Sequence, residues 1–395
     1  MPGTFHRPDD VEEFGVATRK RVGVIGCGLI AQVMHLPYLA ELSDRFEIAA
    51  LCDVSDEVVE ACAQRYGVSC ISTRAEDLLE QPLDAVMVLI PGDHAPLAIA
   101  AADRGLHVFV EKPMAISSAQ CAEMIRAAEA AGTTLMVGTM KRYDRAYERF
   151  VELVSAVEGP RLVRVETLES PLEPYVTHYP LVRATRPPAP ELIARWEAEE
   201  RPHLDLTLDS DPDETNRFVY RNILLDNLVH EFNMLRGAFG EPTAVCYASL
   251  DPRSVAVHMR FGDLDCHLSW VDLPGIARYK QEVALYGPDE RLVLTFPSPF
   301  LRSAATRLSV EGGERGTSHA WSRDEVVSYD AAFKRELEEF HDSIMSGRAP
   351  RTSGADGLRD LLLCEAIARA HRTGAPVAAP TEPPAAIVAQ GSESS

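Results

Sequence analysis

The segment from Val22 to Ala31 restricts the fold of this chain more than any other part of its sequence. An apolar strand pattern, RVGVIG, leads directly into Gly26-Cys27-Gly28-Leu29-Ile30-Ala31, which fits G-x-G-x-x-G/A, and helical spacing follows to Leu42. In such a unit the first glycine makes a tight turn, the second lets the backbone approach a pyrophosphate, and the small third residue lets helix and strand pack closely. The segment therefore predicts a Rossmann-type dinucleotide-binding loop, whose cofactor residues are Gly26, Gly28, Leu29, Ile30 and Ala31.

An acidic residue ends the next predicted strand. FEIAALCD finishes at Asp53, which follows Gly28 by 25 residues (53 − 28). A carboxylate at this place can bind the ribose hydroxyls of an adenosine and repels a 2′-phosphate, so NAD is favoured over NADP. Asp53 could instead cap the helix that begins after Ser55. We prefer the cofactor interpretation, because Asp53 completes a strand–turn–helix–strand–acid unit.

Short apolar runs and helical stretches alternate from Arg21 to about Val137. The predicted strands after Asp53 are DAVMVLI, HVFV and TLMVG, and the helices between them end at Gly105 and Gly132. Ser117 and Gln120 form a capping box at the start of the second helix. DAVMVLI is apolar throughout, which is typical of a strand buried on both faces of a parallel sheet. We therefore predict an α/β fold with a doubly wound parallel sheet over residues 21–145.

The character of the sequence changes after Gly159-Pro160. SVAVHMRF places alternate apolar residues on one face, and CHLSW, EVALYG and RLVLTF continue this period of two. Such runs indicate a mostly antiparallel sheet with one solvated or partner-covered face. Helical spacing returns from Ala331 to Thr373. The pattern predicts a second, α+β domain over residues 146–376 with an open, mostly antiparallel sheet, and it favours a homodimer or homotetramer that buries the open face.

Three segments lie outside the two main patterns: both ends of the chain and an insertion within the second domain. Residues 1–20 are expected to form an N-terminal arm, and residues 377–395 a disordered tail. An insertion at about 170–215 is rich in proline and acidic residues. Long segments of this kind are usually functional or disordered. The insertion could close over a substrate or serve as an oligomer arm, and its polar candidates in the first case are Tyr175, His178, Tyr179 and Arg183.

Charge and cysteine usage exclude several classes of protein. The formal net charge is −21, whereas nucleic acids and anionic membranes require a basic surface. We find no run of 18 apolar residues and no apolar core of a signal peptide. The eight cysteines form no C-x-x-C pair, which argues against zinc and favours a reducing, cytoplasmic compartment. Asp209, Asp211 and Asp213 resemble the start of a calcium loop, but its glycine and later glutamate are absent, so no metal is predicted.

Two groups of residues carry candidate chemistry. Glu111-Lys112-Pro113 follows the strand HVFV, at the edge where open parallel sheets bind ligands. Partial burial can hold a lysine pKa near neutrality and let the lysine act on a substrate hydroxyl, although such lysines are more often solvated. Asp226 and His230 are four residues apart, on one face of an otherwise apolar helix. Without further context, a capping aspartate and a core histidine is the simpler interpretation of that pair.

The order of several motifs resembles the Gfo/Idh/MocA family, the glucose–fructose oxidoreductase and inositol dehydrogenase-like enzymes. The resemblance extends from about Arg21 to Pro376 and rests on GCGLIAQVMHLPYL, LCD, PGDHAPLAIAAADRGLHVFVEKPMA, MVGTMKRYDRAY, LLDNLVHEFNMLRGAFG and SGADGLRDLLLCEAIARAHRTGAPV. The lysine of E-K-P and the D-x-x-x-H pair are the part most specific to the family. Where many members have T-P-N-x-x-H, this chain has Ile90-Pro91-Gly92-Asp93-His94, which is one residue shorter.

The resemblance implies roles for individual residues. Lys112, Asp226 and His230 would form the catalytic group: His230 as general base or acid, Lys112 orienting the reacting oxygen and contacting the nicotinamide ribose, and Asp226 binding the substrate. The remaining cofactor residues would be Asp53, Pro91, His94 and Glu111. The substrate residues would be Met140, Lys141, Arg142, Asp226 and Asn227. Lys141 or Arg142 could hold a hydroxyl or an anionic group, or could instead be an exposed cation at the start of a helix.

The same resemblance implies an NAD(P)-dependent dehydrogenase. It would transfer a hydride between the nicotinamide and a secondary alcohol or ketone of a sugar, cyclitol or sugar derivative, with NAD as the expected cofactor. An alternative is a glycosidase or lyase that uses tightly held NAD for a transient oxidation. A non-catalytic NAD-sensing regulator would have little reason to keep Lys112, Asp226 and His230 together.

Overall fold

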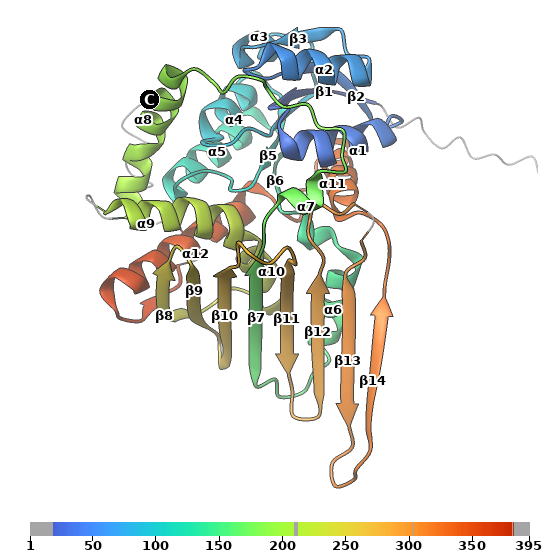
Figure 1. Cartoon of the computed structure of the whole chain (residues 1–395), viewed down its shortest axis with the longest axis vertical. Coiled ribbons are helices and arrows are strands. Elements are labelled where there is room, and N and C mark those ends of the chain that lie inside the picture. Colours follow the sequence, from blue (N-terminus) through green and yellow to red (C-terminus); the bar gives the residue numbers. More distant parts are fainter. Residues whose placement is uncertain (1–18, 209–211, 303, 381, 383–395) are drawn as a thin grey trace, which may run out of the picture.

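A parallel sheet lies in the first third of the chain in the computed structural model, which describes residues 19–208, 212–302, 304–380 and 382 (Figure 1). Its strand order is β3-β2-β1-β4-β5-β6, and the pairings between these strands are parallel. The strands are β1 (Lys20–Ile25), β2 (Phe46–Cys52), β3 (Cys70–Ser72), β4 (Ala85–Val88), β5 (His107–Glu111) and β6 (Leu135–Gly138). The predicted doubly wound α/β fold is confirmed.

Helices connect the strands of this half, and all of them except the short third one lie where the sequence predicted a helix. The connecting helices are α1 (Leu36–Glu41), α2 (Asp56–Tyr66), α3 (Ala75–Leu79), α4 (Ala95–Ala102) and α5 (Ser118–Ala131). The Ser117 side chain accepts a hydrogen bond from the backbone N–H of Gln120 at the start of α5, and Gly132 ends that helix with φ +65°. The helix predicted from Leu29 differs in one respect. It begins at Leu29 as predicted, but the stretch Ala31–His35 is π-helical and continues into α1.

A second sheet fills the other half of the molecule. Its order is β14-β13-β12-β11-β7-β10-β9-β8-β15, and among the described pairings β7 with β10 is parallel whereas the others are antiparallel. The strands are β7 (Leu162–Glu169), β8 (Ala244–Asp251), β9 (Ser254–Phe261), β10 (Leu264–Asp272), β11 (Lys280–Tyr286), β12 (Glu290–Phe296), β13 (Arg307–Gly313), β14 (Ala320–Val326) and β15 (Val377–Ala378). The mostly antiparallel sheet is confirmed. Contrary to prediction, residues 377 and 378 are a short strand rather than the start of a disordered tail.

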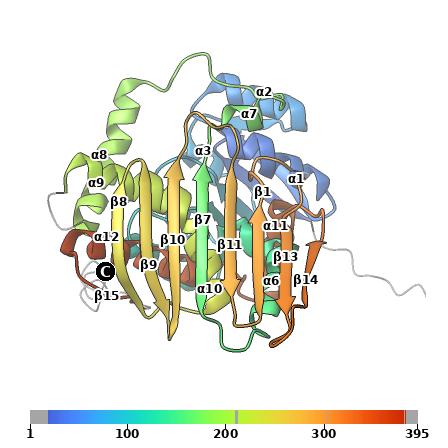
Figure 2. The same cartoon turned by 60° about the horizontal axis from the view of Figure 1, so that its bottom comes forward.

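One face of the second sheet is covered by helices, and Figure 2 shows the other face open. The covering elements are α6 (Arg145–Val154), the π-helical η3 (Val219–Leu228), α10 (Val229–Phe239) and α12 (Gly354–Thr373). The open face carries ion pairs, including Lys280–Glu166 and Arg164–Glu166, each at 2.7 Å. Burial of this face against a second copy stays a prediction, which light scattering can check.

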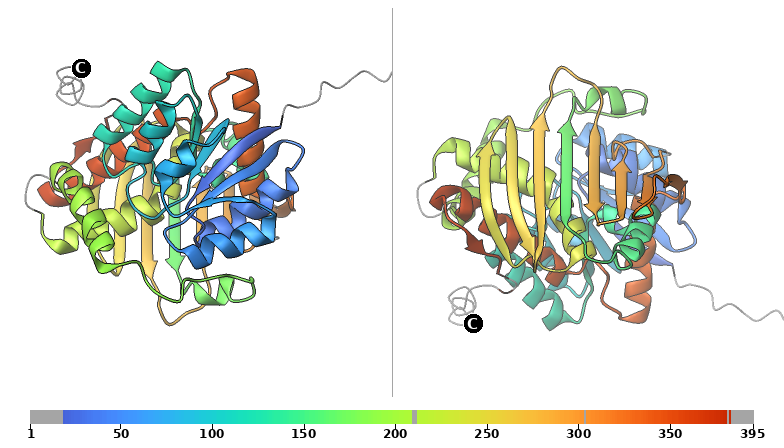
Figure 3. Two further views of the ribbon diagram at one scale, coloured as in Figure 1. Left: turned by 90° about the horizontal axis from the view of Figure 1, so that it is seen from above. Right: turned by 90° about the horizontal axis from the view of Figure 1, so that it is seen from below.

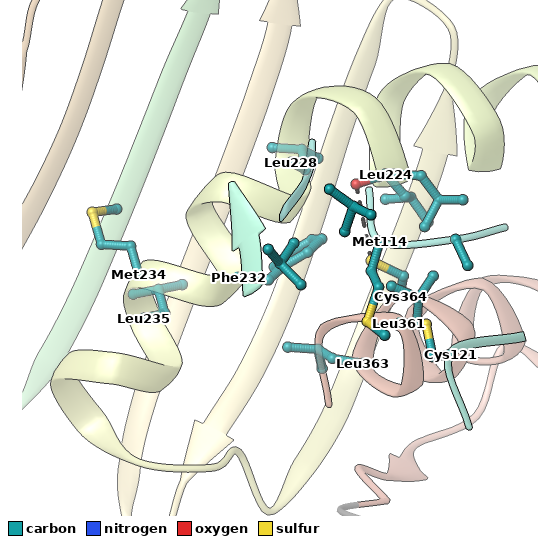
Figure 4. Close-up of a cluster of buried hydrophobic side chains, with 14 of the residues drawn as sticks. Met114, Cys121, Leu224, Leu228, Phe232, Met234, Leu235, Leu361, Leu363 and Cys364 are labelled. Carbon is teal, nitrogen blue, oxygen red and sulfur yellow. Dashed lines mark hydrogen bonds between the residues drawn. The ribbon is translucent and has the colours of Figure 1, made fainter. Parts of the chain in front are cut away.

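A buried cluster fixes the helix that carries Asp226 and His230. Figure 4 shows Leu224, Leu228 and Phe232 of η3 and α10 beside side chains of α12. These three side chains are completely buried, and the Cys364 thiol of α12 lies 3.9 Å from the Leu224 carbonyl oxygen. These contacts hold the helix in place, and Asp226 on the same helix contacts Lys112, which directly follows β5 of the parallel sheet.

The predicted insertion is partly helical. It contains α7 (Glu173–Val176) and α8 (Pro190–Thr207), and it is followed by α9 (Glu214–Phe218). Between α7 and α8 the chain runs along the edge of the parallel-sheet domain, beside α2 (Figures 1 and 3). There Gln32 exchanges two hydrogen bonds with the backbone of Val182, at 2.9 Å each.

Several expectations fall on residues outside the described ranges. These are residues 1–18 of the arm, residues 383–395 of the tail, and Asp209 and Asp211 of the suspected calcium loop. Asp213 is described, and its carboxylate accepts from the backbone N–H of Asn216 to cap α9. Within the described ranges, no helix has both the length and the apolar character needed to cross a membrane.

Candidate active site

The glycine loop has the geometry that a bound dinucleotide requires. Gly26 has φ +96°, and a Cβ there would lie 2.8 Å from backbone atoms of Leu89, so this position demands glycine. A Cβ on Gly28 would meet nothing within 4 Å. The space above Gly28 is therefore open to a ligand, at a helix start where backbone N–H groups favour an anion.

Asp53 lies beside this loop, at the end of β2. One of its carboxylate oxygens accepts a hydrogen bond from the backbone N–H of Cys27 at 2.8 Å, and the other accepts from the N–H of Ser55 at 2.9 Å. Asp53 therefore holds the glycine loop against β2, a contact that the sequence did not indicate. Each oxygen keeps a lone pair for another donor.

One cavity of about 680 Å³ connects the glycine loop to the second sheet. The predicted cofactor residues on its wall are Gly28, Leu29, Ile30, Pro91, His94, Glu111 and Lys112. The His94 ring lies between two carbonyl oxygens, those of Ile90 and Pro113, at 2.8 Å each. It thereby joins the loop after β4 to the loop that carries Lys112.

The three predicted catalytic residues meet in this cavity. The Lys112 ammonium group donates to the carboxylate of Asp226 at 2.8 Å and to its backbone carbonyl at 2.6 Å. His230 follows Asp226 by one helical turn and lines the same wall. Burial, and then the positive charges of Lys141 and Lys112, hold the pKa of His230 well below its usual value. This lowered pKa favours the neutral ring, and its buried Nδ1 has no hydrogen-bond partner in the described residues.

Two buried acids, Glu111 and Glu336, lie close to the loop that carries Lys112. The Glu111 carboxylate contacts the His35 ring at 2.6 Å and accepts from the backbone N–H of Lys112 at 3.0 Å. Glu336, on α11 (Ala332–Ser346), is completely buried. Its carboxylate oxygens have no hydrogen-bond partner in the described part of the chain. Burial, and then the charge of Glu111, raise the pKa of Glu336 well above its usual value of 4.5.

This shift predicts a pH-dependent stability. The folded protein keeps a proton on Glu336 that the unfolded chain releases above its ordinary pKa, so the free energy of unfolding falls as the pH rises toward the folded pKa. One proton accounts for at most about 1.4 kcal/mol per pH unit. Glu336→Gln mimics the protonated acid, so we expect the variant to lose less stability than the wild type between pH 5 and pH 8 in urea unfolding. Equal losses in Glu336→Gln and in a Glu338→Gln control on the same helix would contradict this assignment.

The predicted substrate residues separate into two groups. Met140, Lys141, Asp226 and Asn227 line the cavity. Arg142 is not among the described lining residues. Its guanidinium donates to the carbonyl oxygen of Asn233 at 3.2 Å and lies 3.6 Å from Asp356, so it ties α10 to α12.

Several residues on the cavity wall were missed by sequence reasoning. They come from β7 and the segment after it, from η3 and α10, and from the loops before β11 and after β12: Thr167, Glu169, Ser170, Leu172, Arg221, Asn222, Glu231, Tyr279, Ser298 and Phe300. Glu231 adjoins His230 and could have been suspected from that position. Of the insertion's candidates Tyr175 also lines the cavity, where its hydroxyl accepts from the backbone N–H of Tyr279 at 2.6 Å.

The other insertion candidates lie away from the cavity lining. His178 and Arg183 are exposed. The Tyr179 hydroxyl donates to the carbonyl oxygen of Phe300 at 2.7 Å. The Arg221 side chain at the cavity rim pairs with Glu200 of α8 at 3.2 Å, so the insertion contributes to the rim through α8 as well as through Tyr175.

Comparison with known proteins identifies the class of protein to which this fold and site correspond. A family model described as an oxidoreductase family with an NAD-binding Rossmann fold matches residues 20–139. These residues include the glycine loop, Asp53 and Lys112, and the cavity continues from them to His230. The fold and the site together define an NAD(P)-dependent oxidoreductase.

Similar proteins cover almost the whole chain. Myo-inositol 2-dehydrogenase of Thermotoga maritima is 26% identical over 87% of this chain and 93% of its own length. Inositol 2-dehydrogenase 3 of Saccharopolyspora erythraea is 28% identical over 90% and 94%. Among solved structures, levoglucosan dehydrogenase in complex with NADH has a TM-score of 0.70 at 18% identity, over 92% of this chain and 100% of that one. Residues 20–139 thus match the model of the Gfo/Idh/MocA family, and the similarity to inositol dehydrogenases over most of the chain agrees with the family that the motifs predicted.

Proposed function

We propose that this protein is a dehydrogenase that oxidises a secondary alcohol of a sugar, cyclitol or sugar derivative, or reduces the matching ketone. The observation that carries the proposal is the Lys112–Asp226 ion pair beside a neutral His230, in a cavity that begins at the glycine loop. The named activities of the inositol and levoglucosan dehydrogenases support the substrate class.

The cavity residues divide the work between binding and proton transfer. Gly28, Leu29 and Ile30 would hold the dinucleotide, whose nicotinamide takes up or gives the hydride. Lys112 donates a hydrogen bond to the substrate oxygen and stabilises negative charge on it. His230, kept neutral by its surroundings, takes the hydroxyl proton. Asp226 holds Lys112 in place and accepts a hydrogen bond from the substrate.

We propose NAD rather than NADP as the cofactor. The carboxylate of Asp53 at the end of β2 would repel a 2′-phosphate, and its free lone pairs can accept from ribose hydroxyls. Titration of the protein with NADH and NADPH, followed by nicotinamide fluorescence, tests this preference. Binding of NADPH at least as tight as NADH would overturn it.

A substrate screen tests the dehydrogenase proposal. Purified protein is assayed with NAD and NADP against sugars, inositols and sugar phosphates, and reduced cofactor is followed at 340 nm. We expect steady formation of NADH with at least one polyol. An enzyme that oxidises its substrate only transiently would instead convert it with no net NADH, which is the signature of the glycosidase or lyase alternative.

The lowered pKa of His230 predicts the acid limb of the pH profile. A base stops working when it becomes protonated, and a lowered pKa moves that protonation to a lower pH. We therefore expect kcat/KM for alcohol oxidation to fall only below pH 6.5, the usual imidazole pKa. In His230→Gln this limb should disappear along with most of the activity. A limb that persists in the variant would belong to another group.

A further inference from the structure

Two carboxylates line the side of the cavity that adjoins the second sheet. Glu169 ends β7, and Glu231 lies on α10 directly after His230. Both line the cavity, and only 2% of the Glu231 surface is exposed. One Glu231 oxygen accepts from the Thr167 hydroxyl at 2.7 Å. The other is buried and has no hydrogen-bond partner in the described residues.

The nearest positive charge does not neutralise this pair. Lys141 interacts electrostatically with both carboxylates, yet its ammonium group donates to the Gln281 side chain and lies 5.4 Å from the centre of the Phe296 ring. Across the described chain, neither Glu169 nor Glu231 has a Lys or Arg nitrogen within ion-pair distance. Lys112 is already paired with Asp226.

Charge and hydrogen bonding therefore define which ligand groups can bind beside Glu169 and Glu231. Two carboxylates face one lysine, so the group carries an excess negative charge when both acids are ionised. The free Glu231 oxygen needs a donor, because a buried acceptor without one costs stability. A hydroxyl or an ammonium group supplies a donor, whereas a phosphate or carboxylate brings a like charge.

We propose that Glu231 and Glu169 determine substrate specificity by binding hydrogen-bond donors of an uncharged or aminated polyol and rejecting sugar phosphates and sugar acids. The inference rests on the proposed dehydrogenase function. It also argues against the sequence-based expectation that Lys141 or Arg142 holds an anionic group of the substrate. Lys141 sits among acids and is held by Gln281, and Arg142 pairs with Asp356, so neither is a free cation for an anionic substrate.

A matched set of ligands tests the proposal. The protein saturated with NADH is titrated with D-glucose, D-glucosamine, D-glucose 6-phosphate and D-glucuronate, and with the same derivatives of any polyol that the 340 nm screen identifies. Cofactor fluorescence reports binding, and KM and kcat are measured for every ligand that turns over. We expect the neutral or aminated compound to bind at least 100-fold tighter than the phosphate or the acid.

Two variants separate charge from shape. Glu231→Gln keeps the size of the side chain and an oxygen for Thr167 but removes the charge. We expect it to reduce the preference over anionic ligands at least tenfold, mainly through KM. Glu166→Gln, on the open face of the same strand β7, is the control and should leave the preference unchanged.

The outcomes distinguish this inference from the proposed function. Equal or tighter binding of the phosphate or the acid by the wild type, or an unchanged preference in Glu231→Gln, would overturn the specificity assignment while NADH binding and turnover persisted. Failure of the protein to bind NADH, or to bind any of these ligands, would overturn the proposed function and this inference with it.

Discussion

Replacing Lys112 with methionine is expected to lower kcat for alcohol oxidation by about 10³-fold, within the range that one catalytic donor or proton-transfer group contributes. Methionine keeps the length of the side chain but removes the ammonium group, which donates to Asp226 at 2.8 Å and faces the cavity beside His230. Loss of this charge also removes one cause of the lowered pKa of His230. The acid limb of the remaining activity should therefore move to higher pH.

Two measurements make the Lys112 experiment decisive. NADH affinity should change much less than kcat, because the glycine loop and Asp53 are untouched. Lys334→Met is the matched control. Lys334 lies on α11, outside the cavity lining, and its ammonium group pairs with Glu41 of α1 at 3.1 Å. Activity of Lys112→Met within a few-fold of the wild type would show that Lys112 takes no part in the chemistry.

Gly28→Ala is expected to weaken NADH binding by roughly 10- to 100-fold while the protein stays folded, because the methyl group fills the space where backbone and pyrophosphate must approach each other. A Cβ at this position meets no protein atom within 4 Å. The free energy of unfolding without cofactor should therefore stay the same or rise by about 0.4–1 kcal/mol, since alanine has less freedom in the unfolded chain.

Gly26→Ala, in contrast, should lower the stability of the protein itself. Its Cβ would collide with the backbone of Leu89 and Ile90, and the backbone has φ +96°. We expect a loss of at least about 1–3 kcal/mol of stability in the absence of cofactor. Thermal unfolding and NADH titration of the two variants, measured side by side, check the contrast. NADH affinity of Gly28→Ala equal to that of the wild type would place the dinucleotide elsewhere.

Much of the parallel-sheet domain could be predicted because its signals are local. The turn at Gly26, the cap at Ser117 and the αL end at Gly132 each depend on the backbone of a few neighbouring residues. Strand β7 was missed, although Val163 and Val165 alternate with polar neighbours. Its place between β10 and β11 depends on contacts with segments about 100 residues away, which a short pattern does not contain.

In the candidate site, too, some residues could be predicted from the sequence and others depend on long-range contacts. Lys112, Asp226 and His230 were predicted through the family resemblance, and the cavity brings them together. Glu169 was missed because strand and helix periods place a side chain on a face but do not say which distant face it meets. Arg142 illustrates the reverse case: it follows Lys141 directly, yet it turns away to Asp356.

The sequence by itself determined the tight glycine turn between strand and helix at Gly26 to Ala31, because such a turn has few solutions and glycine supplies them. Only the tertiary structure decided what faces that loop across the cavity. Lys112 and Asp226 are 114 residues apart, and Glu231 meets Thr167 across 64. Such contacts arise from the packing of η3 and α10 between the two sheets. Long-range packing, which leaves no periodic trace in the chain, therefore decides which charged side chains line the cavity.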